Sequence, residues 1–163
     1  MPDIFNPSYL IFLHGLEGTS QGVKATLLRR LFPGMLTPDF SGSLEERMAT
    51  LKPILGDQEI WTIVGSSFGG LMAALFTCQC PLQVRKLVLL APALILPQFA
   101  SSNLTPVNVP TIIYHGRQDK IIPLEPTRRL AYQVFQNLDF HEVDDDHGLF
   151  KTVMEIDWPV LFA

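Results

Sequence analysis

A serine between two glycines is the clearest sign of chemistry in this chain. The segment Gly65-Ser66-Ser67-Phe68-Gly69 follows an apolar run that begins at Ile60, and a helix-favouring run follows it directly. Gly-x-Ser-x-Gly between a strand and a helix is the nucleophile-elbow pattern, because residues without a Cβ let the backbone turn sharply around the serine. The pattern predicts that Ser67 presents its hydroxyl at the tip of this turn, where helix N–H groups favour a developing negative charge.

A nucleophilic serine needs a base to take its proton and an acid to hold that base in the correct tautomer. His147 and Asp119 are the candidates, since each follows a predicted strand and the chain order Ser67, Asp119, His147 suits an open α/β sheet. The acidic run Asp144 to Asp146 competes with Asp119 as the source of the acid. We interpret these three aspartates as solvated loop charges, one of which could hold the loop or raise the basicity of His147.

For the other three histidines we expect no part in proton transfer. His14 lies in a Gly-rich loop after the first predicted strand, and we expect it to shape that loop through a hydrogen bond rather than to transfer a proton. His115 is expected to orient the loop that carries Asp119. His141 is expected to be a strand residue without chemistry.

Alternating strands and helices must position these residues. Apolar runs of strand length are predicted to form strands at 9–13, 60–64, 86–90, 111–114 and 139–143, with a further short strand at 35–37. Helices are predicted at 22–31, after Ser43, after the elbow, at 125–135 and from 147 onward; the first carries Val23, Leu27, Leu28 and Leu31 on one face. The alternation predicts an α/β fold with a mainly parallel sheet of about six strands and helices on both faces.

Composition narrows the class of protein. A chain of 163 residues with 47% hydrophobic and 17% charged residues predicts a single compact domain, 1–163. A net charge of -4 without a basic run argues against nucleic-acid binding. The segment Met1 to Pro7 lacks the features of an export signal, and the apolar run Leu87 to Leu96 is too short to span a membrane, so we expect a cytoplasmic protein.

Two cysteines, Cys78 and Cys80, are two residues apart on a predicted helix and point to different faces, which argues against a disulfide or a metal site. We interpret both as small buried hydrophobic residues.

Four segments together resemble the α/β-hydrolase superfamily, in particular its small bacterial esterase-like members: FLHGLEGT at 12–19, VGSSFGG at 64–70, YHGRQDKIIP at 114–123 and DHG at 146–148. The resemblance implies that Ser67 is the nucleophile, Asp119 the acid and His147 the general base. It also implies an oxyanion hole formed by the backbone N–H groups of Leu16 and Phe68.

The implied activity is that of a serine hydrolase that cleaves a small-molecule carboxylic ester or thioester through an acyl-enzyme intermediate, without a metal or organic cofactor. Alternatives are a triad enzyme acting on peptides, lactones or another acyl acceptor, a non-catalytic binding protein in which Ser67 is inert, and a scaffolding protein. Fewer than twenty residues separate Ala91 from Thr111, too few for a cap domain. Substrate contacts are expected at His14, Gly15 and Leu94, although the apolar segment 92–109 that contains Leu94 could instead pack on the core.

Overall fold

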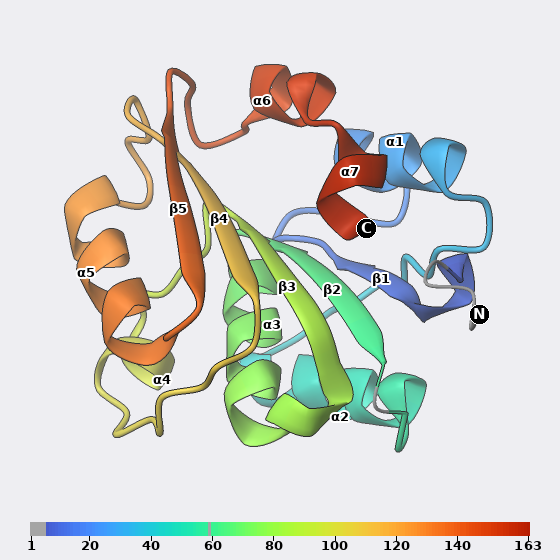
Figure 1. Cartoon of the computed structure of the whole chain (residues 1–163), viewed down its shortest axis with the longest axis horizontal. Helices are drawn as coiled ribbons and strands as arrows, with labels where there is room; N and C mark the ends of the chain where they lie inside the picture. Colours follow the sequence, from blue (N-terminus) through green and yellow to red (C-terminus); the bar gives the residue numbers. More distant parts are fainter. Residues whose placement is uncertain (1–5, 59) are drawn as a thin grey trace.

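The protein folds around one parallel β-sheet whose strands lie in sequence order (Figure 1). A computed structural model describes residues 6–58 and 60–163. The segment Met1 to Pro7, for which no export signal is expected, therefore lies mostly outside the described residues. The five strands are all parallel to their neighbours. They are β1 (Leu10–Leu13), β2 (Trp61–Ser66), β3 (Val84–Leu90), β4 (Thr111–Gly116) and β5 (Leu138–Val143).

Helices cover both faces of the sheet, as Figure 1 shows. One face packs against α2 (Leu44–Leu55), α3 (Phe68–Gln79), the short α4 (Pro97–Ala100) and α5 (Leu124–Val134). The other face packs against α1 (Val23–Leu31), α6 (Phe150–Glu155) and α7 (Trp158–Phe162). Two 3-10 turns, η1 (Pro7–Tyr9) and η2 (Pro81–Gln83), precede β1 and β3. The predicted α/β fold is therefore confirmed.

The sheet has five strands where about six were expected. The segment predicted as a strand at 35–37 forms only an isolated parallel bridge between Leu36 and Ile11, since its neighbours Gly34 and Pro38 leave too few residues for a ladder. The apolar face predicted for α1 is only partly buried. Val23 and Leu31 are 57% and 45% exposed, while Ala25 and Leu28 are buried.

The segment between β3 and β4 carries no cap domain. All of residues 91–110 are described, and α4 is the only helix among them. No helix in the described part of the chain is long and apolar enough to cross a membrane. The carboxyl ends of the strands are therefore not covered by an inserted domain, and ligands of open parallel sheets bind at this edge.

Gly69 allows α3 to lie directly against the end of β1. A Cβ at this position would lie 2.0 Å from the carbonyl oxygen of Leu13 and 2.5 Å from that of His14, distances that no side chain can occupy. A Cβ at Gly65 would likewise lie 2.5 Å from the carbonyl oxygen of Gly69. The two glycines of the motif are thus required by close backbone packing around Ser67.

Replacing Gly69 by alanine should therefore destabilise the fold. We expect Gly69→Ala to lower the free energy of unfolding by about 2 kcal/mol or more, because the added methyl group overlaps backbone that cannot move without shifting β1. Urea unfolding followed by circular dichroism measures this change. Gly15→Ala is the control, since its Cβ would meet no atom closer than 3.5 Å; an equal loss in both variants would contradict the packing argument.

Candidate active site

Ser67 occupies a strained turn between β2 and α3. Its backbone angles are φ 54° and ψ -112°, a combination that residues other than glycine rarely adopt. Three hydrogen bonds hold this conformation: the Ser67 N–H donates to Leu90, and the Ser67 carbonyl accepts from Leu71 and Ala93. The elbow therefore has the geometry that its sequence predicts.

The three side chains predicted to act together form one chain of hydrogen bonds. The ring nitrogen Nε2 of His147 lies 3.0 Å from Oγ of Ser67, and Nδ1 lies 2.8 Å from Oδ2 of Asp119. The residues come from the loops after β2, β4 and β5, which reach the same edge of the sheet. A carboxylate only accepts hydrogen bonds, so Nδ1 carries the proton and Nε2 is free to accept the serine hydroxyl.

Asp119 is fixed by its own loop. Its side chain is fully buried. Oδ1 accepts the backbone N–H groups of Ile121 and Ile122 at 2.9 and 2.8 Å, which leaves Oδ2 facing His147. The carboxylate is therefore held in the position that orients the imidazole.

His115 holds the Asp119 loop through a hydrogen bond, which is consistent with the prediction that it orients this loop. Its Nε2 lies 2.8 Å from the carbonyl oxygen of Ile122, so this nitrogen must donate, and it also lies 3.3 Å from Oδ2 of Asp119. The residue has no exposed surface, and burial lowers its pKa, although the Ile122 carbonyl and the Asp119 carboxylate act in the opposite direction. The ring is therefore neutral at pH 7, so its approach to Asp119 is not an ion pair, and Nε2 donates its hydrogen bond to the Ile122 carbonyl.

The loop that carries His147 depends on Gly116 at the end of β4. A Cβ at Gly116 would lie 2.2 Å from the carbonyl oxygen of Asp145, so the loop can approach β4 only because this residue is glycine. That same carbonyl accepts the N–H of Gln118 at 3.0 Å. The loops of Asp119 and His147 are thereby tied together.

The acidic run holds the loop, and none of its described carboxylates forms a hydrogen bond or ion pair with the His147 ring. Asp144 accepts from the Gln118 side chain, and Asp146 accepts the N–H of Gly148. Asp145 accepts from both the N–H and the hydroxyl of Thr152 in the first turn of α6. Partial burial acts to raise the pKa of Asp145, yet its hydrogen bonds with Thr152 and the Asp146 N–H outweigh that effect and lower it.

The two N–H groups predicted to form an oxyanion hole come from different segments, one from the residue after the serine and one from the loop after β1. Phe68 begins α3, so its N–H lies at the helix end where such groups lack an intrahelical acceptor. Leu16 lies in the loop after β1, next to Gly15, whose added Cβ would be 3.5 Å from that of Ser67. No described group accepts a hydrogen bond from either N–H.

Two of the three residues predicted to contact substrate lie near the serine. Gly15 lies directly beside Ser67, and both Gly15 and His14 line a small pocket of about 190 Å³. Both ring nitrogens of His14 are engaged, Nδ1 with the Gly15 carbonyl at 2.7 Å and Nε2 with the Phe40 N–H at 2.9 Å, as a loop-shaping residue requires. Leu94 has no exposed surface and packs in the core, so the structure favours the packing alternative for it.

A larger open pocket of about 570 Å³ lies on the His147 side of the site. Its apolar walls are Ile121 and Phe150, which are 67% and 53% exposed, and Phe150 also borders the small pocket beside Gly15. The sequence analysis did not identify Phe150 as a site residue, because Phe150 was expected only as part of the closing helix from 147 onward. Its position two residues after His147-Gly148 was the available signal.

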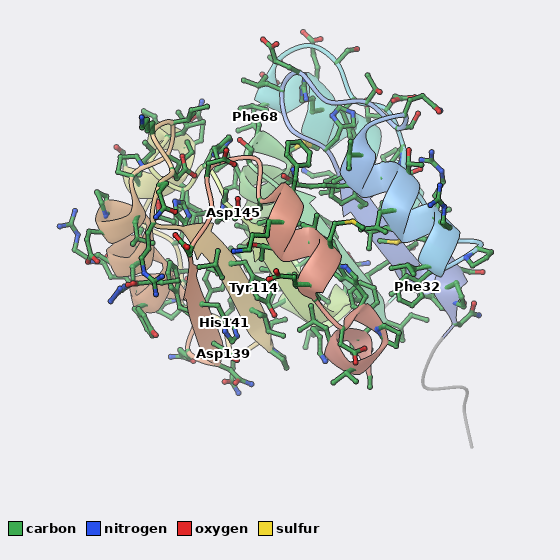
Figure 2. All side chains as sticks on the ribbon, turned by 90° about the horizontal axis from the view of Figure 1, so that it is seen from above. Phe32, Phe68, Tyr114, Asp139, His141 and Asp145 are labelled. Atoms are coloured by element: carbon green, nitrogen blue, oxygen red, sulfur yellow. The ribbon has the colours of Figure 1, made fainter. Side chains whose placement is uncertain are left out.

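The remaining candidates stay outside this site. Figure 2 shows Tyr114, His141 and Asp139 grouped along β4 and β5, away from Phe68; His141 stacks on Tyr114 and contacts the Asp139 carboxylate at 2.9 Å. Cys78 and Cys80 are free and half-buried, and burial raises the pKa of the Cys78 thiol to about 11. Within the described ranges, no three His, Cys, Asp or Glu side chains are grouped to hold a metal ion.

The lowered pKa of His115 makes stability depend on pH. An unfolded histidine takes up a proton below about pH 6.5, whereas buried His115 resists protonation, so the unfolded chain binds more protons and the folded state loses stability as pH falls below that value. We expect the free energy of unfolding to fall with a limiting slope of about 1.4 kcal/mol per pH unit for this one group. Urea unfolding between pH 8 and 5 measures it.

His115→Gln should flatten this dependence, because the amide stays neutral and can still donate to the Ile122 carbonyl. The control is His141→Gln, which changes an exposed histidine on β5 and should retain the wild-type slope. Equal slopes for the wild type and His115→Gln would contradict the assignment.

Comparison with known proteins agrees with the geometry. A family model described as the alpha/beta hydrolase fold matches residues 32–107. A sequence search among curated proteins found no match. Among solved structures, a protein from Xanthomonas campestris pv. campestris described as a hydrolase of the α/β superfamily has 25% identity and a TM-score of 0.74, covering 92% of this chain and 92% of that one.

Two further structures share the fold. Alpha/beta hydrolase domain-containing protein 10 from mouse has 18% identity and a TM-score of 0.77, covering 93% of this chain and 88% of that chain. Est1E from Butyrivibrio proteoclasticus, with ferulic acid bound, has 16% identity and a TM-score of 0.73, covering 99% and 92%. Together with the strand–serine–helix turn and the order of the strands, these matches show that the chain has the α/β-hydrolase fold.

Proposed function

We propose that this protein is a serine hydrolase that cleaves carboxylic esters or thioesters. The observation that carries the proposal is the continuous chain of hydrogen bonds from Ser67 through His147 to Asp119. The fold alone does not require these three residues to meet, because many proteins share a fold without sharing its chemistry.

In the first half of the proposed reaction, Oγ of Ser67 attacks the substrate carbonyl carbon while Nε2 of His147 takes the hydroxyl proton. The carbonyl oxygen becomes an oxyanion, which the N–H groups of Leu16 and Phe68 stabilise. His147, now protonated and held by Asp119, gives its proton to the departing alcohol or thiol. The acyl group remains on Ser67.

In the second half, water enters on the same side as His147 and loses a proton to Nε2 as it attacks the acyl carbon. Collapse of the second tetrahedral intermediate releases the carboxylic acid and returns the proton to Ser67. Each step uses only groups of this chain and water. Each oxyanion donor is worth about 3 to 4 kcal/mol of transition-state stabilisation in enzymes of this type.

We infer that the pocket on the His147 side holds the leaving group of the substrate. A leaving group that receives its proton from Nε2 must depart beside His147, and Ile121 and Phe150 provide apolar surface there. The carboxylic acid bound to Est1E is the type of product that such a reaction would release. An ester or thioester with an apolar leaving group is therefore the substrate class that we propose.

Removal of the nucleophile should abolish turnover without unfolding the protein. We expect Ser67→Ala to lower kcat/KM for p-nitrophenyl acetate by about 10⁴-fold or more, since loss of one member disables a catalytic triad. Initial rates measured spectrophotometrically on purified protein test this expectation, with circular dichroism as the check on folding.

Ser66→Ala is the matched control, because Ser66 precedes the nucleophile in the same motif but makes no hydrogen bond to His147. It should keep kcat/KM within a few-fold of wild type. Retention of most activity by Ser67→Ala would contradict the proposal, and an inert wild-type protein across acetyl, butyryl and thioester substrates would favour the binding-protein alternative.

A further inference from the structure

We propose that Arg47 is a positioning residue for the oxyanion hole. The inference rests on the proposed function and adds a residue that the sequence reasoning did not identify. Arg47 lies on α2, far from Ser67 in sequence, yet its guanidinium contacts both residues whose N–H groups are proposed to hold the oxyanion.

The guanidinium of Arg47 joins three separate segments. Nε donates to the carbonyl of Gly42 at 3.0 Å, in the loop before α2. Nη2 donates to the carbonyl of Leu16 at 3.3 Å, in the loop after β1. The guanidinium carbon also lies 5.3 Å from the ring centroid of Phe68, the first residue of α3. One side chain thus fixes the first loop relative to the helix that begins at the nucleophile.

Few other contacts restrain the position of Leu16. Its side chain is 58% exposed, so packing does not restrain it. The neighbouring Gly15 carbonyl accepts from the Gly18 N–H and from Nδ1 of His14, which fixes the start of the loop. The Leu16 N–H belongs to the same planar peptide unit as the Gly15 carbonyl, so these two bonds orient it. The bond from Arg47 to the Leu16 carbonyl restrains the peptide unit that follows, on the other side of Leu16.

The charge of Arg47 is also unusual. The residue is only 4% exposed, and within residues 6–58 and 60–163 no carboxylate forms an ion pair with it. Its Nη1 has no hydrogen-bond partner among the described groups. A buried charge without a counter-ion is costly. A contribution to stability alone therefore does not explain a buried arginine at this position. A positive charge next to Leu16 and Phe68 would instead favour the negative charge that develops on the substrate oxygen.

The test compares kcat with KM in Arg47→Met, which keeps the length and apolar character of the stem but removes the guanidinium. With p-nitrophenyl acetate we expect kcat to fall about 10- to 100-fold, because a misplaced oxyanion donor weakens binding of the transition state. KM should stay within about threefold of wild type. The affinity for an alkyl boronic acid, whose serine adduct is tetrahedral and anionic, should fall by the same factor as kcat/KM.

Arg47→Lys keeps the inference testable if Arg47→Met does not fold. A lysine keeps the charge but lacks the fork that reaches the Gly42 and Leu16 carbonyls together. We expect it to fold and to show a smaller loss of kcat and of boronic acid affinity, in parallel. Arg85→Met is the control, since Arg85 donates to the Phe162 carbonyl at the opposite ends of the strands; it should keep wild-type kcat and boronic acid affinity.

Three results would overturn the inference. A folded Arg47→Met or Arg47→Lys protein with wild-type kcat and boronic acid affinity would show that the contacts do not position the donors. A rise in KM alone would assign Arg47 to substrate binding. Absence of ester turnover by the wild-type protein would instead remove the proposed function, and the inference with it.

Discussion

The close contact between α3 and the end of β1 is the constraint on which the rest of the structure depends. Gly69 lets the helix begin against the Leu13 carbonyl, and this places Ser67 beside the loop that follows β1. The strained backbone of Ser67 costs about 1 to 3 kcal/mol, which its hydrogen bonds with β3 and the segment after it help to offset. This one packing contact therefore brings the proposed nucleophile next to the loop that is proposed to complete the oxyanion hole.

The other half of the site is assembled by a second close contact, at Gly116. Because the His147 loop can press against the end of β4, its histidine meets Asp119 from the neighbouring strand. His115 donates to the Ile122 carbonyl and so holds the loop whose N–H groups bind the carboxylate. In both halves, glycine backbone and buried hydrogen bonds set the distances; the Asp119 side chain stays buried, and the His147 side chain is 20% exposed.

The sequence predicted those parts of the molecule that depend on local spacing. The elbow at Ser67, the strand ends and the meeting of Ser67, Asp119 and His147 follow from motif order and from the alternation of elements. Contacts between distant segments could not be predicted in this way. Nothing near Arg47 in sequence indicates that it reaches Leu16 and Phe68, since a charged helical residue ordinarily faces solvent. The core position of Leu94 and the exposure of Val23 depend on packing across the sheet, which a single helical or apolar pattern does not specify.

The central claim is that Ser67 is an activated nucleophile, and intact-protein mass after exposure to a fluorophosphonate tests it most directly. The probe phosphonylates activated serines irrespective of the natural substrate, so the result does not depend on finding that substrate. We expect a single adduct on the wild-type protein and none on Ser67→Ala. A folded wild-type protein that acquires no adduct, or an adduct that persists in Ser67→Ala, would contradict the account.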